Sequence, residues 1–201
     1  MEKSKKPTYL FIDGTNLYAA QYELFGPKRY LNFGKFIDKI EEKIGVKFDK
    51  IYFYASYSPK PKRPTRKEKL YLKNEALFYR SVRKTPKVVF FKGYRSKTSG
   101  KEKEVDVKLA VDIVHFAHLR KYDLVYLLSG DADFMHALKI AEILKRKIFI
   151  LAIENRIPNR LSFHYRTYVV VFRGKFKGKI FPKQKIKFLF ADRKELIGEV
   201  K

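Results

Sequence analysis

The strongest constraint on the fold is a regular alternation along the first 156 residues. Short apolar segments, typical of buried strands, alternate with longer segments whose apolar residues recur at helical spacing. The predicted strands cover residues 9–12, 51–55, 88–91, 124–128 and 148–152, and the predicted helices cover residues 36–44, 66–83, 106–120 and 134–145. This order favours an α/β fold with a mostly parallel central sheet and helices on both faces.

The pattern changes after residue 156. Strand-like segments follow one another at residues 168–172, 175–181 and 185–190, and two of them have basic residues between the apolar ones. The first can still belong to the main sheet, but the segment from Gly174 onward is too short for a core of its own. We therefore predict a main domain over residues 1–173 and a basic, β-rich C-terminal extension over residues 174–201 that packs on it.

The chain is strongly basic, with a formal net charge of +25. Residues 58–103 carry sixteen Lys and Arg against three Glu, and residues 157–201 carry twelve against three acidic residues, so the remainder is nearly balanced. Such self-repulsion favours a polyanionic partner, and RNA or DNA is the natural candidate. The alternative is a solvated, Lys-rich surface of the thermophile type, although such surfaces usually balance Lys with Glu.

Cysteine is absent and there are four histidines, so any bound metal must be held largely by oxygen. Oxygen ligands indicate Mg²⁺ or Mn²⁺. The sequence also lacks a run of about 18 apolar residues, and a charged leader passes directly into the first short strand, unlike a signal peptide. A soluble, cytoplasmic protein with no membrane partner is therefore expected.

Acidic residues follow two of the predicted strands. Asp13 comes directly after residues 9–12, and Asp131 and Asp133 follow residues 124–128 through the turn Ser129-Gly130. Ligands of open α/β sheets bind outside the carboxyl ends of the strands. Carboxylates that meet at this edge repel one another unless a cation neutralises them, so the pattern predicts a divalent metal.

Three further polar residues belong to the same argument. Asp106 opens the helix before the fourth strand, which predicts a fourth oxygen donor at this edge, and Asn16 can orient a ligand without adding charge. Asp112 lies six residues after Asp106, about 240° around the helix at 100° per residue. That separation makes Asp112 a doubtful ligand.

Three segments of the chain, taken together, resemble the signature blocks of NYN-domain proteins, which are relatives of PIN-domain nucleases and include the LabA-like group. The segments are Phe11-Ile12-Asp13-Gly14-Thr15-Asn16-Leu17, Glu104-Val105-Asp106-Val107-Lys108-Leu109-Ala110-Val111-Asp112 and Leu128-Ser129-Gly130-Asp131-Ala132-Asp133-Phe134. Their order and spacing match over roughly residues 8 to 172. Glu104 stands where the family often has Gly, so the turn before this helix departs from the pattern.

The resemblance implies a Rossmann-like PIN fold and a metal-dependent ribonuclease. Its catalytic residues would be Asp13, Asn16, Asp106, Asp131 and Asp133, and the four aspartates would bind one or two Mg²⁺ or Mn²⁺ ions. Asp112 also matches the family pattern, which conflicts with the helix-face argument, so Asp112 and Ser129 are given supporting roles.

The RNA strand is expected to be held by lysines of the polar loop over residues 93–103 and of the C-terminal extension. These are Lys97, Lys101, Lys103, Lys175 and Lys177. The oligomeric state stays open, and a homodimer is one possibility.

Several alternatives compete with this interpretation. A single Asp after a strand is often a helix cap, and Asp131 or Asp133 could cap the next helix. His115 and His118 have no partner cluster for zinc, and a haloacid dehalogenase-type phosphatase needs a nucleophilic Asp at position 11, where this chain has Phe. The main alternative in function is a catalytically silent RNA-binding or regulatory NYN module.

Overall fold

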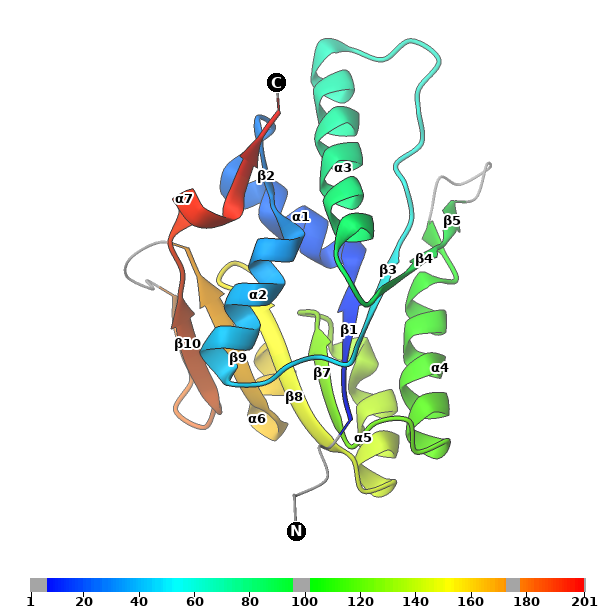
Figure 1. Ribbon diagram of the computed structural model, residues 1–201, viewed down its shortest axis with the longest axis vertical. Helices are drawn as coiled ribbons and strands as arrows, with labels where there is room; N and C mark the ends of the chain where they lie inside the picture. The colour runs from blue at the N-terminus through cyan, green and yellow to red at the C-terminus, as the bar shows by residue number, and fades with distance from the viewer. Residues whose placement is uncertain (1–6, 96–101, 173–177, 201) are drawn as a thin grey trace.

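The computed structural model describes residues 7–95, 102–172 and 178–200. Their centre is a seven-stranded sheet in the order β10-β9-β8-β7-β1-β3-β4 (Figure 1). All six neighbouring pairs are parallel, which confirms the predicted sheet. The strands are β1 (Thr8–Asp13), β3 (Lys50–Ala55), β4 (Val88–Lys92), β7 (Leu124–Leu128), β8 (Lys147–Ile153), β9 (Arg166–Val171) and β10 (Ile186–Phe190).

Two helical layers cover the sheet (Figure 1). One apolar core joins Leu10 and Ile12 to α1 (Gly14–Phe25), α2 (Phe33–Ile44) and α3 (Arg66–Lys84). The other joins Phe11 to α4 (Val105–His118), α5 (Met135–Ile143) and α6 (Asn159–His164). Successive side chains of a strand point to opposite faces, so both faces of β1 are buried, which explains why the strand is a continuous apolar run.

Helix α1 was not expected from the sequence. Glu23 is the only exposed residue of α1, and the buried face that includes Leu17 and Tyr18 also holds the polar Gln21, so no clear division into apolar and polar faces appears in the pattern. Gln21 is fully buried, and its amide accepts a hydrogen bond from the Leu31 backbone N–H at 3.0 Å and donates one to Asn74 at 3.3 Å. These polar contacts come from distant parts of the chain, which local periodicity cannot reveal.

The C-terminal residues are part of the main sheet. The strand expected at residues 168–172 is β9, and the one expected at residues 185–190 is β10, its parallel neighbour. Beyond it, α7 (Arg193–Leu196) leads to β11 (Ile197–Glu199), which pairs antiparallel with β2 (Arg29–Leu31). The domain boundary at residue 174 stays a prediction.

Two local predictions need correction. The strand expected at residues 175–181 lies partly outside the described residues, and residues 178–181 form no strand because a turn brings the Phe181 N–H to the Gln184 side chain. Within the segment expected to be a loop, β5 (Tyr94–Arg95) pairs antiparallel with β6 (Glu102–Lys103). In the described ranges, no helix is long and apolar enough to cross a membrane.

Candidate active site

Asp13 ends β1 and also caps α1. Its Oδ1 accepts a hydrogen bond from the Asn16 backbone N–H at 2.9 Å, and its Oδ2 accepts one from the Ser129 hydroxyl at 3.1 Å. The residue is only 6% exposed. Both oxygens are therefore held in place by groups from two different strand ends, a capping role that is compatible with a role in chemistry.

Ser129 connects Asp13 to Asp131. Register places Ile12 beside Leu128, so the residues that follow these strands also meet at the carboxyl edge of the sheet. The buried Ser129 hydroxyl donates to Asp13 and accepts from the Asp131 backbone N–H at 3.0 Å. Asn16 joins the same arrangement, because its Oδ1 accepts from the Gly130 N–H at 3.5 Å. We call this connection of Asp13, Ser129 and Asp131 the Asp13–Asp131 bridge.

Asp131 caps a short 3₁₀ helix, η1 (Ala132–Phe134), through a 2.9 Å hydrogen bond from the Asp133 N–H to its Oδ1. Its Oδ2 accepts no hydrogen bond from the described part of the chain, and the residue is partly exposed. Asp131 can therefore cap η1 with one carboxylate oxygen and bind a metal ion with the other. Asp133 is exposed beside it.

Asp106 lies in the first turn of α4 and is exposed. This helix begins after the β5–β6 pair, which follows the carboxyl end of β4, and then runs back along the sheet (Figure 1). Asp106 thus lies on the carboxyl side of the sheet, as expected. The preceding Glu104 has a positive φ of 69°, a conformation that glycine adopts without strain. The backbone here therefore keeps the conformation that a glycine would favour, although this chain has Glu at the position.

Asp112 has a different environment. It is buried, and its carboxylate accepts hydrogen bonds from the Tyr54 hydroxyl at 2.8 Å and from the Lys108 ammonium. Burial raises the pKa of Tyr54, and the hydrogen bond to Asp112 raises it further, so the phenol keeps its proton. Asp112 therefore ties α4 to the end of β3.

Removing the Tyr54 hydroxyl should destabilise the fold without abolishing chemistry. Tyr54→Phe removes one of the hydrogen-bond donors to the buried Asp112 carboxylate. We therefore expect a decrease of about 1–3 kcal/mol in the free energy of unfolding. Urea unfolding measures this decrease. Tyr52→Phe, on the same strand, is the control: it keeps the ring that packs on the core and removes a hydroxyl with no hydrogen-bond partner in the described residues, so stability should change by less than about 0.5 kcal/mol. An unchanged free energy of unfolding in Tyr54→Phe would show that this hydrogen bond does not stabilise the contact between α4 and β3.

Two glycines permit close approach at this edge. A Cβ on Gly14 would lie 2.2 Å from the Phe53 ring, and one on Gly130 would lie 2.9 Å from the Arg156 carbonyl oxygen. Sequence reasoning did not select Arg156. Its guanidinium donates to the Asn155 carbonyl and pairs with Glu23 of α1. Its position after β8, at the same carboxyl edge, is the signal that could have identified it.

The donors at this edge suit Mg²⁺ or Mn²⁺ by chemistry, because all of them are carboxylate or neutral oxygen atoms. The acidic side chains at this edge are only partly brought together. The Asp13–Asp131 bridge brings two aspartates to the same serine, yet among residues 7–95, 102–172 and 178–200 no three acidic or histidine side chains are grouped so as to hold an ion. The four-aspartate site stays a prediction.

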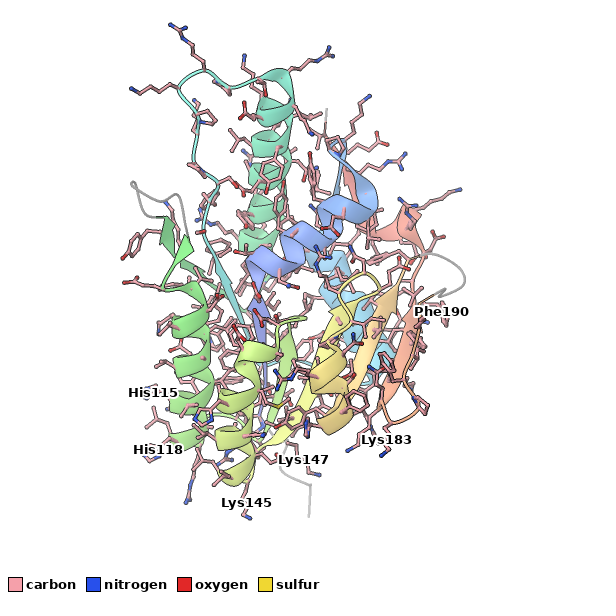
Figure 2. The ribbon with its side chains drawn as sticks, turned by 180° about the vertical axis from the view of Figure 1, so that it is seen from behind. His115, His118, Lys145, Lys147, Lys183 and Phe190 are labelled. Carbon is pink, nitrogen blue, oxygen red and sulfur yellow. The ribbon has the colours of Figure 1, made fainter. Side chains whose placement is uncertain are left out.

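The expected RNA-binding lysines are not placed by the structure. Lys97, Lys101, Lys175 and Lys177 lie outside the described residues, and for Lys103 only the backbone, in β6, is described. His115 and His118 lie in the last turns of α4, at the opposite end of that helix from Asp106 (Figure 2).

The main sheet is parallel, and Asp13 and Asp131 are joined through Ser129 at its carboxyl edge. The model of the NYN domain family matches residues 7–171, so the chain belongs to that PIN-like nuclease family. It is 25% identical over 160 residues to the low amplitude and bright protein LabA of Synechococcus elongatus, covering 76% of each chain. A crystal structure of a protein of unknown function from Vibrio parahaemolyticus shares the fold, with a TM-score of 0.61 and 20% identity over 88% of this chain and 98% of that one.

Proposed function

We propose that this protein is a metal-dependent ribonuclease that hydrolyses RNA phosphodiester bonds at the carboxyl edge of its sheet. The observation that supports this most directly is the Asp13–Asp131 bridge, in which one serine hydroxyl contacts the Asp13 carboxylate and the Asp131 backbone N–H and so brings together two aspartates from neighbouring strand ends. Membership of a PIN-like nuclease family supports the same reaction class.

The aspartates expected to hold Mg²⁺ or Mn²⁺ are Asp13, Asp106, Asp131 and Asp133, of which Asp13 and Asp131 are joined through Ser129. Such a cation, when bound, supplies charge stabilisation for the reacting phosphate and lowers the pKa of water. The chain itself orients the donors: Ser129 and the Asn16 N–H fix Asp13, and the Asp133 N–H fixes one oxygen of Asp131, while the other accepts no hydrogen bond from the described residues. The Arg156 backbone carbonyl lies beside the Gly130 turn, but its guanidinium is paired with Glu23, so Arg156 is given no role in holding the phosphate.

A nucleic-acid substrate is proposed because the charge of the chain is so unbalanced, and RNA is chosen because the family resemblance implies a ribonuclease. Forty-six basic residues against twenty-one acidic ones give a surface that gains free energy by releasing counterions from a polyanion. The alternative, a silent RNA-binding or regulatory module, uses the same surface and dispenses with catalysis.

One incubation separates these two functions. Mixed cellular RNA is treated with the protein in Mn²⁺ or Mg²⁺, and in parallel with EDTA. We expect cleavage with the metal and none with EDTA, since the carboxylates alone repel the phosphate. RNA that is bound but uncleaved in every metal would favour the silent module.

A further inference from the structure

The opposite edge of the sheet carries basic residues at the start of five of its seven strands, all but β7 and β1. Because every strand of the main sheet is parallel, all strands begin at one edge, remote from the Asp13–Asp131 bridge. Lys50, Lys147 and Arg166 are the first residues of β3, β8 and β9, and Lys87 and Lys185 immediately precede β4 and β10. We define the amino-edge rim as Lys50, Lys87, Lys145, Lys147, Arg166, Lys183, Lys185 and Lys187.

The rim has little acidic compensation. Lys87 donates to the Phe48 carbonyl and Lys185 to the His164 carbonyl, which are neutral partners. Two acidic residues lie at this edge: Asp123 is paired with Arg146, which lies outside the rim, and Asp49 accepts a hydrogen bond from the Thr8 N–H at 2.9 Å. Within the described ranges, no rim cation forms an ion pair with a carboxylate. Figure 2 shows Lys145, Lys147 and Lys183 along the same end of the molecule.

One part of the rim is hollowed. A depression of about 320 Å³ is lined by Arg166, Tyr168, Gln184, Lys185, Ile186 and Lys187, and none of these is acidic. In register, Lys187 lies beside Tyr168, so cations from two neighbouring strands converge there with an amide and an aromatic ring. Guanidinium, ammonium and amide N–H groups are the donors that bind phosphate oxygens.

A second hollow at this edge gives weaker support for phosphate binding. It is about 560 Å³, lies between the ends of α4 and α5, and is lined by Ala117, His118, Arg120, Leu144, Lys145 and Arg146. Cations at helix C-termini also have a structural purpose, because they complement the helix dipole. No helix of three turns or more ends at Arg166 or Lys187, so that explanation does not extend to the first hollow.

We propose that the amino-edge rim binds the RNA backbone as a second contact surface, centred on Arg166, Lys187 and Lys147. This inference rests on the proposed function in taking RNA as the partner. Strands of five to seven residues separate the rim from the Asp13–Asp131 bridge, which is about 20 Å at about 3.3 Å per residue. A single nucleotide cannot touch both edges. The rim therefore anchors long RNA while another part of the strand reaches the aspartates.

The test replaces three exposed rim cations in one variant, Lys147→Gln, Arg166→Gln and Lys187→Gln. Its control, Lys35→Gln, Lys73→Gln and Lys139→Gln, removes the same charge from exposed positions on α2, α3 and α5. Binding of an RNA of about 40 nucleotides is measured by fluorescence anisotropy in EDTA between 50 and 300 mM salt, and thermal melting confirms folding. We expect the rim variant to bind about tenfold more weakly, with the salt slope reduced by about 2, at about 0.7 per lost contact.

Length dependence gives the second readout. An RNA of about six nucleotides, near the lower site size of single-strand grooves, should bind both variants nearly equally. Equal weakening of long RNA by the rim variant and its control would show a net-charge effect and overturn the proposal. Unchanged binding by the rim variant, or rim-dependent capture of anionic vesicles in place of RNA, would also overturn it. The binding assay is run in EDTA and does not depend on cleavage. It therefore tests the rim even if the parent protein turns out not to cleave RNA.

Discussion

Asp131→Asn is expected to abolish RNA cleavage while RNA binding and folding stay nearly intact. The substitution removes a charge from the carboxylate whose Oδ2 is unused by the described residues, and keeps an oxygen that can accept from the Asp133 N–H. Asn caps helices about as well as Asp, so stability should change by less than about 0.5 kcal/mol. A loss of one interaction made only in the transition state lowers kcat and kcat/KM together, here by about 100-fold or more.

A matched control exists in the same chain. Asp192 caps α7 in the same way, with its Oδ1 accepting from the Lys194 N–H at 2.9 Å. Asp192→Asn makes the same chemical change in the same kind of cap, but at α7, in the C-terminal part of the chain. Both variants should melt at nearly the parent temperature, and only Asp131→Asn should lose cleavage. Retained cleavage in Asp131→Asn would leave that residue as a cap alone.

Gly14→Ala is expected to produce the largest loss of stability. The added Cβ would meet the Phe53 ring at 2.2 Å and the Tyr54 carbonyl oxygen at 2.7 Å, and Phe53 is fully buried. Overpacking of this kind costs about 3 kcal/mol, since neither the strand backbone nor the buried ring can move freely. For a chain of this size we expect the melting temperature to fall by about 6–12 °C.

Gly34→Ala supplies the comparison. It lies inside α2, and its Cβ would meet the Thr85 hydroxyl at 3.3 Å, a contact that a small shift relieves. The helix propensity of Ala offsets that contact, so the change should stay within about 1 kcal/mol. Similar melting temperatures for Gly14→Ala and the parent would show that the backbone after Asp13 yields more easily than the packing indicates.

The sheet could be predicted because its strands are buried on both faces and appear as apolar runs. The five expected strands correspond to β1, β3, β4, β7 and β8. Helix α1 could not be predicted, because its buried polar residue Gln21 forms its hydrogen bonds with Leu31 and Asn74, which are distant in the sequence. The same limit applies to the pairing of Arg156 with Glu23, because contacts across 133 residues leave no local pattern.

The sequence predicted the place of the candidate site, at the carboxyl edge of the sheet, but not how its side chains contact one another. The rule on strand ends placed Asp13 and Asp131 together, whereas the serine between them was given only a supporting role. Helix periodicity separated Asp112 from Asp106, and the structure has one buried against Tyr54 and the other exposed. Whether carboxylates gather around an ion depends on side-chain rotation and on the ion itself, which sequence spacing does not encode.

The most direct test of the metal-dependent site is a titration of the protein with Mn²⁺, followed by the electron paramagnetic resonance signal of the free ion. The parent should bind one or two ions per chain, Asp192→Asn should bind the same number, and Asp131→Asn should lose at least one. Binding that is absent from the parent, or identical in Asp131→Asn, would contradict a metal site at the Asp13–Asp131 bridge.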